Sequence, residues 1–534
     1  MTLTRRTFHR RVIQFATGAV APSVLLDRCQ PPKATPLNTT SMAAGLKAYL
    51  GNVVDELTPE TELLVPTYLG NDRRRFYGRG VPQGLNLLHQ LPLGSGRSYL
   101  GRSLKVWTGA GWTGQPTIIK DFGKTYAILG AFDHHLRKLD LATNQVVWQY
   151  KFDDILKGSS TVYIDPLASN DNRVVILQGS RRGVQNPIRT PKPVPSFRAV
   201  SFRTGQELWR LNLRLTRSFS RDNDSSAINL GNGLLFNVGE NGIGYFLNSA
   251  TATATSKDGI LQPQVFSELK LYQDSDARRY GGNLVAESSP ARLNDRIFLA
   301  AGGGRIYGIS TTTREIIWQF LAGGDLNGTL AISDENKLFC AVEREKIPGR
   351  GGVFKLDPNK PPQEAVEWFF PTLNRGFSTW KGGIVGSVAL NDEYRSPEIP
   401  ALFATNSIDG NLYIGSQHQI TGTQVKGPFL QKTYNTPFVA FQKRLGASIS
   451  TPVFTDGNRL VAAGYNGVYL FQLNFEPTTS AEPNALQSDG GNFYRLRVEE
   501  IGRFKPGISF ESTPVVWDGI VRICSRDGWM YTLG

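Results

Sequence analysis

Short apolar runs alternate with glycine-containing turns along the chain from about residue 100 to residue 534. In the clearest stretch, the run Thr451-Pro452-Val453-Phe454 leads into the turn Asp456-Gly457-Asn458. A second apolar run at residues 459–463 then leads into Asn466-Gly467. Asp-Gly and Asn-Gly turns between apolar runs predict tight hairpins, because glycine accepts the positive φ that such turns require. The pattern predicts an all-β fold built from short antiparallel strands.

A small residue, often next to proline, begins each repeat of this pattern. Eight such starts occur, at Gln115-Pro116, Ser160-Thr161, Ser225-Ser226, Ser289-Pro290, Gly328-Thr329, Gly386-Ser387, Thr451-Pro452 and Thr513-Pro514. Most lie about 40 to 65 residues apart, which suits a four-stranded blade with variable loops. The sequence therefore predicts an eight-bladed β-propeller with four-stranded antiparallel blades, and seven blades is the alternative count.

A turn followed by tryptophan recurs at the end of several repeats. It occurs at residues 139–148, 201–209 and 310–318, and in a looser form at 357–368. In the first three copies a threonine precedes the tryptophan by five positions. We expect Asp or Ser and Thr side chains to hold the turn, and the tryptophan to pack against the neighbouring blade. The residues of this structural docking motif are Asp140, Thr143, Trp148, Thr204, Trp209, Thr313 and Trp318.

The turn and its tryptophan closely resemble the docking repeat of the quinoprotein alcohol dehydrogenase-like (PQQ-repeat) β-propellers, which is A-x-D-x-x-T-G-x-x-x-W. The resemblance covers most of residues 105–534. Asn144 and Arg314 stand where that family usually has glycine. Asparagine tolerates the left-handed conformation expected there, and arginine tolerates it less well.

The resemblance implies two functions of different classes. The first is a non-catalytic binding or interaction scaffold without a cofactor, as in the outer-membrane assembly lipoproteins that resemble this repeat. The alternative is a PQQ-dependent dehydrogenase with an atypical site for PQQ and calcium. Such enzymes commonly stack a disulfide of adjacent cysteines on the quinone, whereas Cys29, Cys340 and Cys524 are far apart here. Their Glu/Asn/Asp calcium set cannot be placed in this sequence either, so we favour the scaffold and predict no catalytic residue.

The two ends of the repeat array predict how the ring closes. The last repeat stops at Tyr531-Thr532-Leu533-Gly534 without an outer strand, and residues 104–107 (Leu-Lys-Val-Trp) resemble an unpaired outer strand. We expect an N-terminal strand to pair with the C-terminal blade, because closure removes exposed strand edges. The propeller would span residues 101–534. Residues 44–100 would form an extension with a short helix at 46–57 and a basic surface loop at 71–79.

The first residues predict export. Residues 4–10 (Thr-Arg-Arg-Thr-Phe-His-Arg) resemble a twin-arginine signal, and the apolar run at residues 12–26 is shorter than the ~20 residues of a membrane-spanning helix. An ordinary basic N-terminus is the alternative. Residues 1–43 are therefore predicted to be an export signal and tether. The mature chain would be periplasmic or at the cell surface, without a transmembrane segment.

Charge and cysteine content limit the kinds of partner, metal site and disulfide that the chain can have. The chain has 59 Lys and Arg against 45 Asp and Glu, for a formal net charge of +14. This excess favours an anionic partner, and nucleic acid is disfavoured if the protein is exported. Three cysteines without a CxxC pair disfavour a zinc site and a disulfide framework.

Arginines and aromatic residues are frequent in the loops that would join one blade to the next. Arginine pairs bidentately with carboxylates, and aromatic rings stack on sugars, so these loops predict a face for an anionic or glycan ligand. The alternative is that they are solvated loop residues of a basic protein. The candidate ligand-binding residues are Trp112, Arg217, Arg221, Arg279, Tyr280, Arg375, Trp380, Arg444 and Arg503.

Two polar clusters are predicted to be turns rather than metal sites. Asp133-His134-His135 falls at a hairpin, where adjacent side chains point to opposite sides. Asp222-Asn223-Asp224 lacks the glycine and the bidentate glutamate of a calcium loop. No metal site is predicted.

Overall fold

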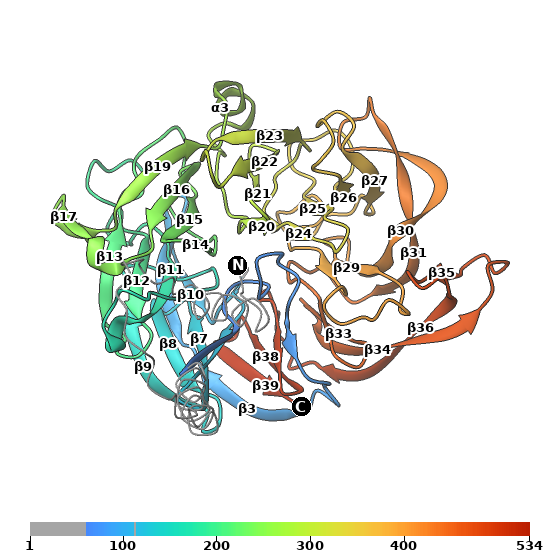
Figure 1. Cartoon of the computed structure of the whole chain (residues 1–534), viewed down its shortest axis with the longest axis horizontal. Helices are drawn as coiled ribbons and strands as arrows, with labels where there is room; N and C mark the ends of the chain where they lie inside the picture. Colours follow the sequence, from blue (N-terminus) through green and yellow to red (C-terminus); the bar gives the residue numbers. More distant parts are fainter. Residues whose placement is uncertain (1–59, 112–113) are drawn as a thin grey trace, which may run out of the picture. The chain divides into compact units, whose positions relative to one another are not determined.

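The computed structural model describes residues 60–111 and 114–534, and nearly half of the chain is β-strand. The sheets form an eight-bladed propeller with antiparallel blades, which confirms the predicted fold class and blade count (Figure 1). The predicted export signal, tether and helix, together with Trp112, lie outside the described residues. Within them, no helix is long and apolar enough to cross a bilayer.

Blades 1 to 4 follow the chain from the inner to the outer strand. Blade 1 holds β6 (Thr117–Asp121), β7 (Lys124–Gly130), β8 (His135–Asp140) and β9 (Gln145–Lys151), and blade 2 holds β10 (Thr161–Ile164), β11 (Val174–Gly179), β12 (Phe197–Ser201) and β13 (Glu207–Leu211). Blade 3 holds β14 (Ile228–Gly231), β15 (Leu234–Gly239), β16 (Ile243–Asn248) and β19 (Val265–Lys270), with a separate hairpin of β17 (Thr255–Lys257) and β18 (Ile260–Gln262). The helix α3 (Asp274–Tyr280) precedes blade 4, which holds β20 (Ala291–Leu293), β21 (Arg296–Ala301), β22 (Arg305–Ser310) and β23 (Ile316–Leu321).

Blades 5 to 8 have the same order, with longer outer strands in blades 6 and 7. Blade 5 holds β24 (Ala331–Ile332), β25 (Leu338–Val342), β26 (Gly352–Leu356) and β27 (Val366–Pro371), and blade 6 holds β28 (Ala389–Leu390), β29 (Leu402–Asn406), β30 (Asn411–Lys426) and β31 (Thr433–Arg444). Blade 7 holds β32 (Val453–Thr455), β33 (Arg459–Gly464), β34 (Gly467–Thr478) and β36 (Phe493–Phe504), with β35 (Leu486–Gln487) at its edge. Blade 8 holds β37 (Val515–Trp517), β38 (Ile520–Cys524) and β39 (Trp529–Leu533) from the C-terminus.

An N-terminal strand completes blade 8, as predicted, but it is not the strand expected. The outer strand is β3 (Leu87–Pro92), in which Gln90 pairs with Tyr531. Residues 104–107 instead belong to β5 (Ser103–Thr108), which pairs with β4 (Ser95–Leu100) in a hairpin of its own. The reason is local: a turn at Gly101, whose φ is +61°, joins β4 directly to β5.

The eight repeat starts meet around the central channel, where their hydroxyl groups link neighbouring blades. In most cases the backbone N–H of one start donates to the hydroxyl of the next blade. The bonds run from Gln115 to Ser159, Ser226 to Ser289, Ser289 to Thr329, Thr329 to Ser387, Ser387 to Thr451 and Thr451 to Thr513. These bonds explain why a serine or threonine recurs at this position.

Residues 66–80, here called the plug, lie within this ring (Figure 1). The plug is flanked by β1 (Thr61–Val65), which pairs with β6, and it contains β2 (Gly78–Arg79), which pairs with β37. Its hydrogen bonds reach all eight blades, at Gln115, Thr161, Ala227, Pro290, Ile332, Leu390, Thr451 and Thr513. The sequence prediction of a surface loop at residues 71–79 is therefore wrong, because the channel supplies carbonyl and carboxylate partners for its arginines.

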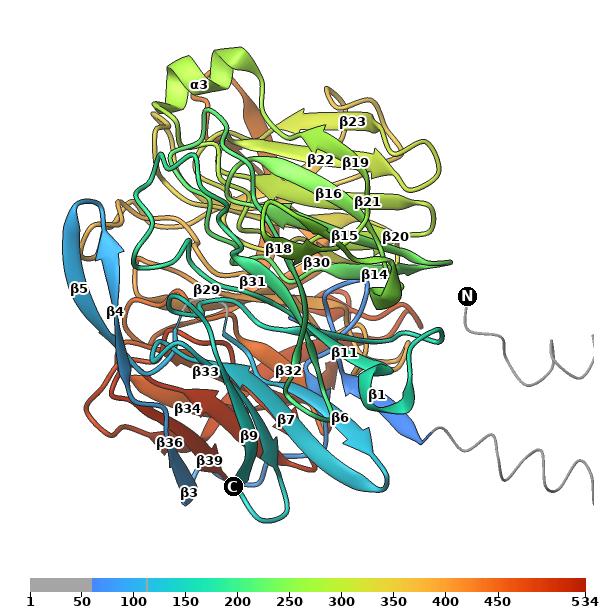
Figure 2. The ribbon, with the colours of Figure 1, turned by 90° about the vertical axis from the view of Figure 1, so that its left-hand side faces the viewer.

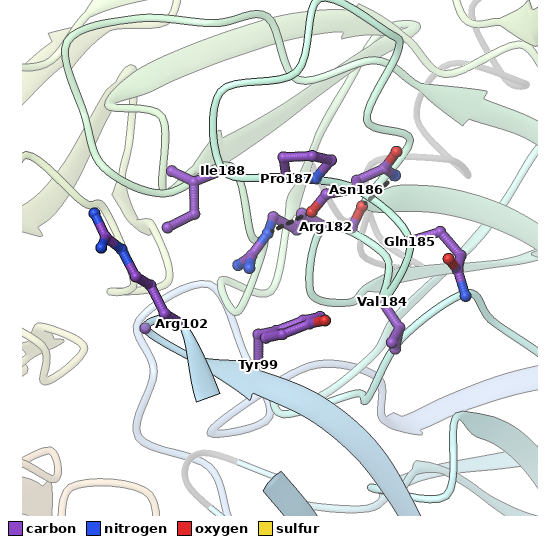
Figure 3. A pocket seen from close by; sticks show the side chains of 9 residues that line it. Tyr99, Arg102, Arg182, Val184, Gln185, Asn186, Pro187 and Ile188 are labelled. Carbon is purple, nitrogen blue, oxygen red and sulfur yellow. Dashed lines mark hydrogen bonds between the residues drawn. The ribbon is translucent and has the colours of Figure 1, made fainter. Parts of the chain in front are cut away.

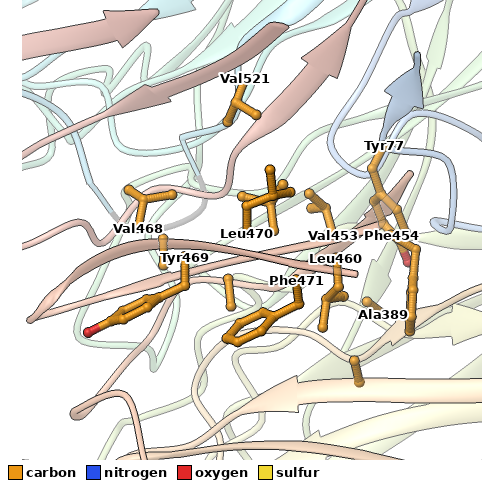
Figure 4. Close-up of a cluster of buried hydrophobic side chains, with 14 of the residues drawn as sticks. Tyr77, Ala389, Val453, Phe454, Leu460, Val468, Tyr469, Leu470, Phe471 and Val521 are labelled. Atoms are coloured by element: carbon orange, nitrogen blue, oxygen red, sulfur yellow. The ribbon is translucent and has the colours of Figure 1, made fainter. Parts of the chain in front are cut away.

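Apolar side chains pack between successive blades. The largest cluster joins blades 6, 7 and 8 and includes Phe454, Leu470 and Val521 (Figure 4). Tyr77 of the plug lies in the same cluster. The plug is thus part of the hydrophobic core as well as of the polar ring.

The docking-motif residues lie at the outer edges of the blades. Asp140 accepts hydrogen bonds from the backbone N–H groups of Ala142 and Thr143. Trp148 donates from Nε1 to Phe202 O at 2.9 Å in the next blade, and Trp318 donates in the same way to Lys360 O at 3.0 Å. Trp209 is buried beside Phe197. The backbone N–H groups of Thr204 and Thr313 donate to the hydroxyl oxygens of Ser201 and Ser310. Asn144 and Arg314 have φ values of +56° and +60°, as expected where the related repeat has glycine.

Replacing Arg74 by alanine should lower the free energy of unfolding by about 3 kcal/mol. Arg74 is fully buried and donates to Thr67 Oγ1, Tyr68 O and Pro290 O at 2.7 to 2.8 Å, so its loss leaves buried acceptors without donors. Urea unfolding measures the change. The matched control is Arg102→Ala in the exposed β4–β5 turn, and equal losses for both variants would contradict a bonding role for Arg74.

Replacing Asn144 by glycine should raise the free energy of unfolding by about 0.5 kcal/mol, because glycine has no steric penalty at positive φ. Thr143→Gly, at the exposed neighbouring position, should lower it. Thermal unfolding of the pair tests this, and stabilisation by both substitutions or by neither would show that the left-handed turn is unstrained.

Candidate functional site

The loops that join the outer strand of one blade to the inner strand of the next share one face of the propeller, here called the loop face. In Figure 2 it lies on the left, where α3, β4 and β5 are labelled. Three carboxylates meet on these loops and turns. Asp224 directly precedes the start of blade 3, Glu287 precedes that of blade 4, and Glu240 lies in the turn between β15 and β16. One oxygen atom from each lies within 4.8 Å of the others.

A lysine is the cation of this cluster. Lys157 Nζ contacts Asp224 Oδ2 and lies 3.7 Å from Glu240 Oε1. The nearby Arg181 is engaged by Asp222, with Nε 2.6 Å from Oδ2. The three carboxylates therefore share one lysine, and the cluster carries more negative than positive groups.

Two further acids continue the cluster toward blade 5. Asp325 Oδ2 accepts a hydrogen bond of 2.8 Å from Asn283, and Glu343 Oε2 accepts one of 3.0 Å from Asn327. Both partners are neutral amides. Asp325, Glu343 and Glu287 form no ion pair with any residue in the described ranges, so none of these carboxyl groups has a direct counter-ion there.

Burial and mutual repulsion shift the pKa values of these acids. Burial raises the pKa of Asp224 and of Asp325 to about 6, and raises that of Glu240 to about 8. Burial and the neighbouring Glu240 raise the pKa of Glu287 to about 8. Burial and Asp325 raise that of Glu343 to about 9. Neutral pH therefore lies close to the titration of several of these groups.

The sequence predicted a turn without a metal at Asp222-Asn223-Asp224 and did not predict that this segment is buried. All three residues are buried. A signal for it is present in the sequence, because Asp224, Glu287 and Glu511 each come directly before a serine that begins or precedes a repeat start. Asp133-His134-His135 is a hairpin turn, in which Asp133 pairs with Arg137 and His135 while His134 Nε2 lies 3.0 Å from Arg97 O. The two imidazoles do not converge.

The structure does not bring the predicted arginines and aromatic residues into one site. Arg221 is buried and donates to Leu213 O of its own loop and to Thr190 O of the loop between β11 and β12, so it joins these two loops. Arg217 pairs with Asp274, Arg503 pairs with Glu500, and Arg444 is exposed at the end of β31.

Two smaller groups of these residues form on the loop face. Arg279 Cζ lies 5.7 Å from the ring of Tyr280 and 5.4 Å from that of Phe429. In the second group, Phe377 and Trp380 contact Tyr465 with ring centroids 4.8 and 6.3 Å apart. Arg375 lies in the same loop and is exposed. Binding by either group stays a prediction.

The carboxylate cluster does not fit the calcium and quinone of the related dehydrogenases. The Lys157 ammonium group already contacts Asp224 and approaches Glu240, so a cation of the chain itself lies among the oxygens that a calcium ion would need. Cys340 and Cys524 are free, buried thiols in blades 5 and 8, and they cannot form a disulfide of adjacent cysteines. No reaction step is derived through this cofactor.

A groove lies on the loop face between the β4–β5 hairpin and the loop of residues 182–188. One cavity of about 390 Å³ is lined by Tyr99, Arg102, Arg182 and residues 184–188 (Figure 3). A second cavity of about 580 Å³ shares residues 184–186 and extends to Arg97 and His134. The hairpin therefore borders an open groove on one side.

Comparison with known proteins gives a likeness of fold. No protein-family model and no curated protein matches the chain. Among solved structures, BamB from Moraxella catarrhalis is similar at 14% sequence identity and a TM-score of 0.49, over 84% of this chain and 99% of that one. A likeness at this level carries nothing about ligands or partners over to this chain.

Raised pKa values of buried carboxylates make stability depend on pH. Between the ordinary pKa of a glutamate and about 8, the folded protein binds protons at Glu240 and Glu287 that the unfolded chain does not. The free energy of unfolding should therefore fall as pH rises from 5 to 9. Glu287→Gln should be more stable than the unmodified protein at pH 9 and nearly equal to it at pH 5.

Thermal unfolding at pH 5, 7 and 9 measures this difference. The exposed Glu364→Gln is the matched control and should show the same pH dependence as the unmodified protein. A pH profile that Glu287→Gln leaves unchanged would contradict the assignment of this titration to the cluster.

Proposed function

We propose that this protein is an exported, non-catalytic interaction propeller of the PQQ-like repeat type, which binds a polypeptide partner at the β4–β5 hairpin. Trp-bearing turns that dock on the next blade support the repeat type. The proposal includes no cofactor. The feature that carries it is the hairpin itself, which stands on the loop face and belongs to no blade (Figure 2).

The inner side of the hairpin is fixed to the propeller. Trp107 packs edge-on against Phe132, with ring centroids 5.6 Å apart, and lies near Arg181 and Arg526. The carbonyls of Arg97 and Tyr99 on β4 accept hydrogen bonds from His134 and Arg181. One edge of the two-stranded sheet is thus occupied by the propeller.

The other side of the hairpin is open and apolar. Leu104 and Val106 alternate with Lys105 and Trp107 on β5, so they face away from the propeller. Their side chains are 42% and 66% exposed, and Leu100 at the turn is 60% exposed. Within the described residues, β5 pairs only with β4. An exposed apolar edge strand is a ready template for a strand from another chain.

Charge indicates the kind of partner. Arg97, Arg102 and Lys105 on the hairpin are all exposed and basic. A second copy of the same strand would bring like charges together, whereas an extended segment with acidic side chains would complement them. We therefore infer an acidic, extended polypeptide segment as the partner.

A second candidate ligand is an anionic glycan. The group of Phe377, Trp380 and Tyr465 presents aromatic rings beside the exposed Arg375 on the same face. Rings of this kind stack on sugars, and an arginine pairs with a sugar carboxylate. This group lies in the loop before blade 6 and in blade 7, so its substitution is separable from that of the hairpin.

A photo-crosslinking residue at Val106 should form one discrete adduct with a partner protein in intact cells, and Leu104→Lys in the same chain should reduce its yield at least about tenfold. The control places the crosslinker at Leu167, which is 77% exposed in blade 2. The partner identified in the adduct is then purified and titrated against both proteins. An adduct of equal yield at Leu167, or no binding by the purified partner, would overturn the proposal.

A further inference from the structure

The carboxylate cluster of Asp224, Glu240 and Glu287 contains more acceptor groups than the described residues satisfy. The Glu240 side chain is only 4% exposed, and its Oε1 receives no hydrogen bond from them. Asp224 Oδ1 is likewise buried and receives no hydrogen bond from the described residues. Glu240 Oε1 lies on the cluster side of its carboxyl group, since it is 3.7 Å from the Lys157 Nζ that contacts Asp224.

A second pair of unsatisfied acceptors lies in the neighbouring loops. Asn283 Oδ1 and Asp325 Oδ1 are buried atoms without a hydrogen bond from the described residues. Both point toward the backbone of Gly302, because a Cβ placed there would lie 3.2 Å from Asn283 Oδ1 and 2.9 Å from Asp325 Oδ1. Unsatisfied hydrogen-bond acceptors are therefore found in blade 3 and in the loops that lead into blades 4 and 5.

Unsatisfied buried acceptors are costly, and they are rare in folded proteins unless a ligand, a water molecule or a proton completes them. Protonation completes at most one oxygen of each carboxyl group. It offers nothing to the Asn283 carbonyl. A group with several N–H donors and a positive charge satisfies both the hydrogen-bonding and the charge requirement of this set.

We propose that this cluster is a binding site for an organic cation, which presents a guanidinium or primary ammonium group to Glu240, Glu287 and Asp325. The chain itself shows that the site accepts such a group, since Lys157 contacts Asp224 through its ammonium. A compact metal ion is less suitable, because it would need oxygens of Asp224 and Glu240 that Lys157 already approaches. An organic cation can bind through Glu287 and Asp325, which lie beyond this ammonium group and form no ion pair with a described residue. Glu287, Asn283 and Asp325 are only partly buried, so a ligand reaches the cluster from the loop face.

The cation comes from a small molecule or from the arginine or lysine of a polypeptide. Both sources share the same chemistry, and the titration separates them. The purified full chain is titrated calorimetrically at low salt with N-acetylarginine amide, with an arginine-containing tripeptide, with the same tripeptide containing citrulline, and with calcium chloride. We expect both arginine compounds to bind and the uncharged citrulline peptide not to bind. Tighter binding of the peptide would identify a polypeptide source, and equal binding would identify a small molecule.

Glu287→Gln should weaken the binding of both arginine compounds about tenfold, because it removes a charge-assisted hydrogen bond. The matched control Glu364→Gln should leave it unchanged. Asn283→Ala offers a second, uncharged test and should also weaken binding. Absence of binding by the arginine compounds, binding that ignores Glu287→Gln, or binding of calcium alone would overturn the proposal.

This site is separate from the hairpin. The variant Leu104→Lys, which tests the polypeptide interface, should leave the arginine titration unchanged. Failure of the hairpin experiment would therefore contradict the polypeptide interface alone, and failure of the cation titration would contradict the cation site alone.

Discussion

A propeller ring stays closed only while its first and last blades are held together, and in this protein one short segment holds every blade. The plug of residues 66–80 hydrogen-bonds to all eight, and β3 completes the blade at the other end of the chain. Arg74 is central to this arrangement, because its guanidinium group satisfies carbonyls of the plug and of blade 4. Burial lowers the pKa of Arg74 to about 10, which still leaves it charged at neutral pH.

The plug also pairs with one set of acidic side chains in the ring and not with another set. Its arginines take up acceptors at the ends of the inner strands, where Arg75 pairs with Asp334, Asp392 and Glu393. The carboxylate cluster on the loop face is not matched in this way among the described residues. There Lys157 and Arg181 face a larger number of acids, and the carboxylates of blades 3 to 5 remain undercompensated. A chain with a net charge of +14 thus contains a local cluster of opposite sign, which net charge alone does not reveal.

The repeat pattern predicted the fold because it reflects interactions between residues of one hairpin or of adjacent blades. Glycine turns, and the hydroxyl groups at seven of the eight starts, act within one hairpin or between adjacent blades, so the eight starts correspond to eight blades. The plug was missed for the opposite reason. Nothing in residues 71–79 distinguishes arginines that lie on a surface from arginines whose partners lie as far away as Glu393. The closing strand was misplaced likewise, because residues 87–92 and 104–107 are both short apolar runs and only the turn at Gly101 decides between them.

The candidate sites show the same limit. The sequence prediction placed these arginines and aromatic residues in the loops between blades, whereas Arg444 and Arg503 lie in the strands β31 and β36. Their grouping depends on blade geometry: Arg221 is buried and bonded to Thr190, while Arg375 is exposed. The carboxylate cluster was harder to find, because its members come from three separate positions of blades 3 and 4. An acid directly before a repeat start was the available signal, since every start lies at the channel and its predecessor must lie near the loop face.

Closure of the ring also determines when the fold can be completed. Gln90 pairs with Tyr531, so the final blade forms only after nearly the whole chain has been made, and contacts of such sequence separation form slowly. Until then β3 lacks the strand with which it pairs, and the clusters beside the plug are exposed to water. An incomplete ring of this kind is prone to pair with other chains.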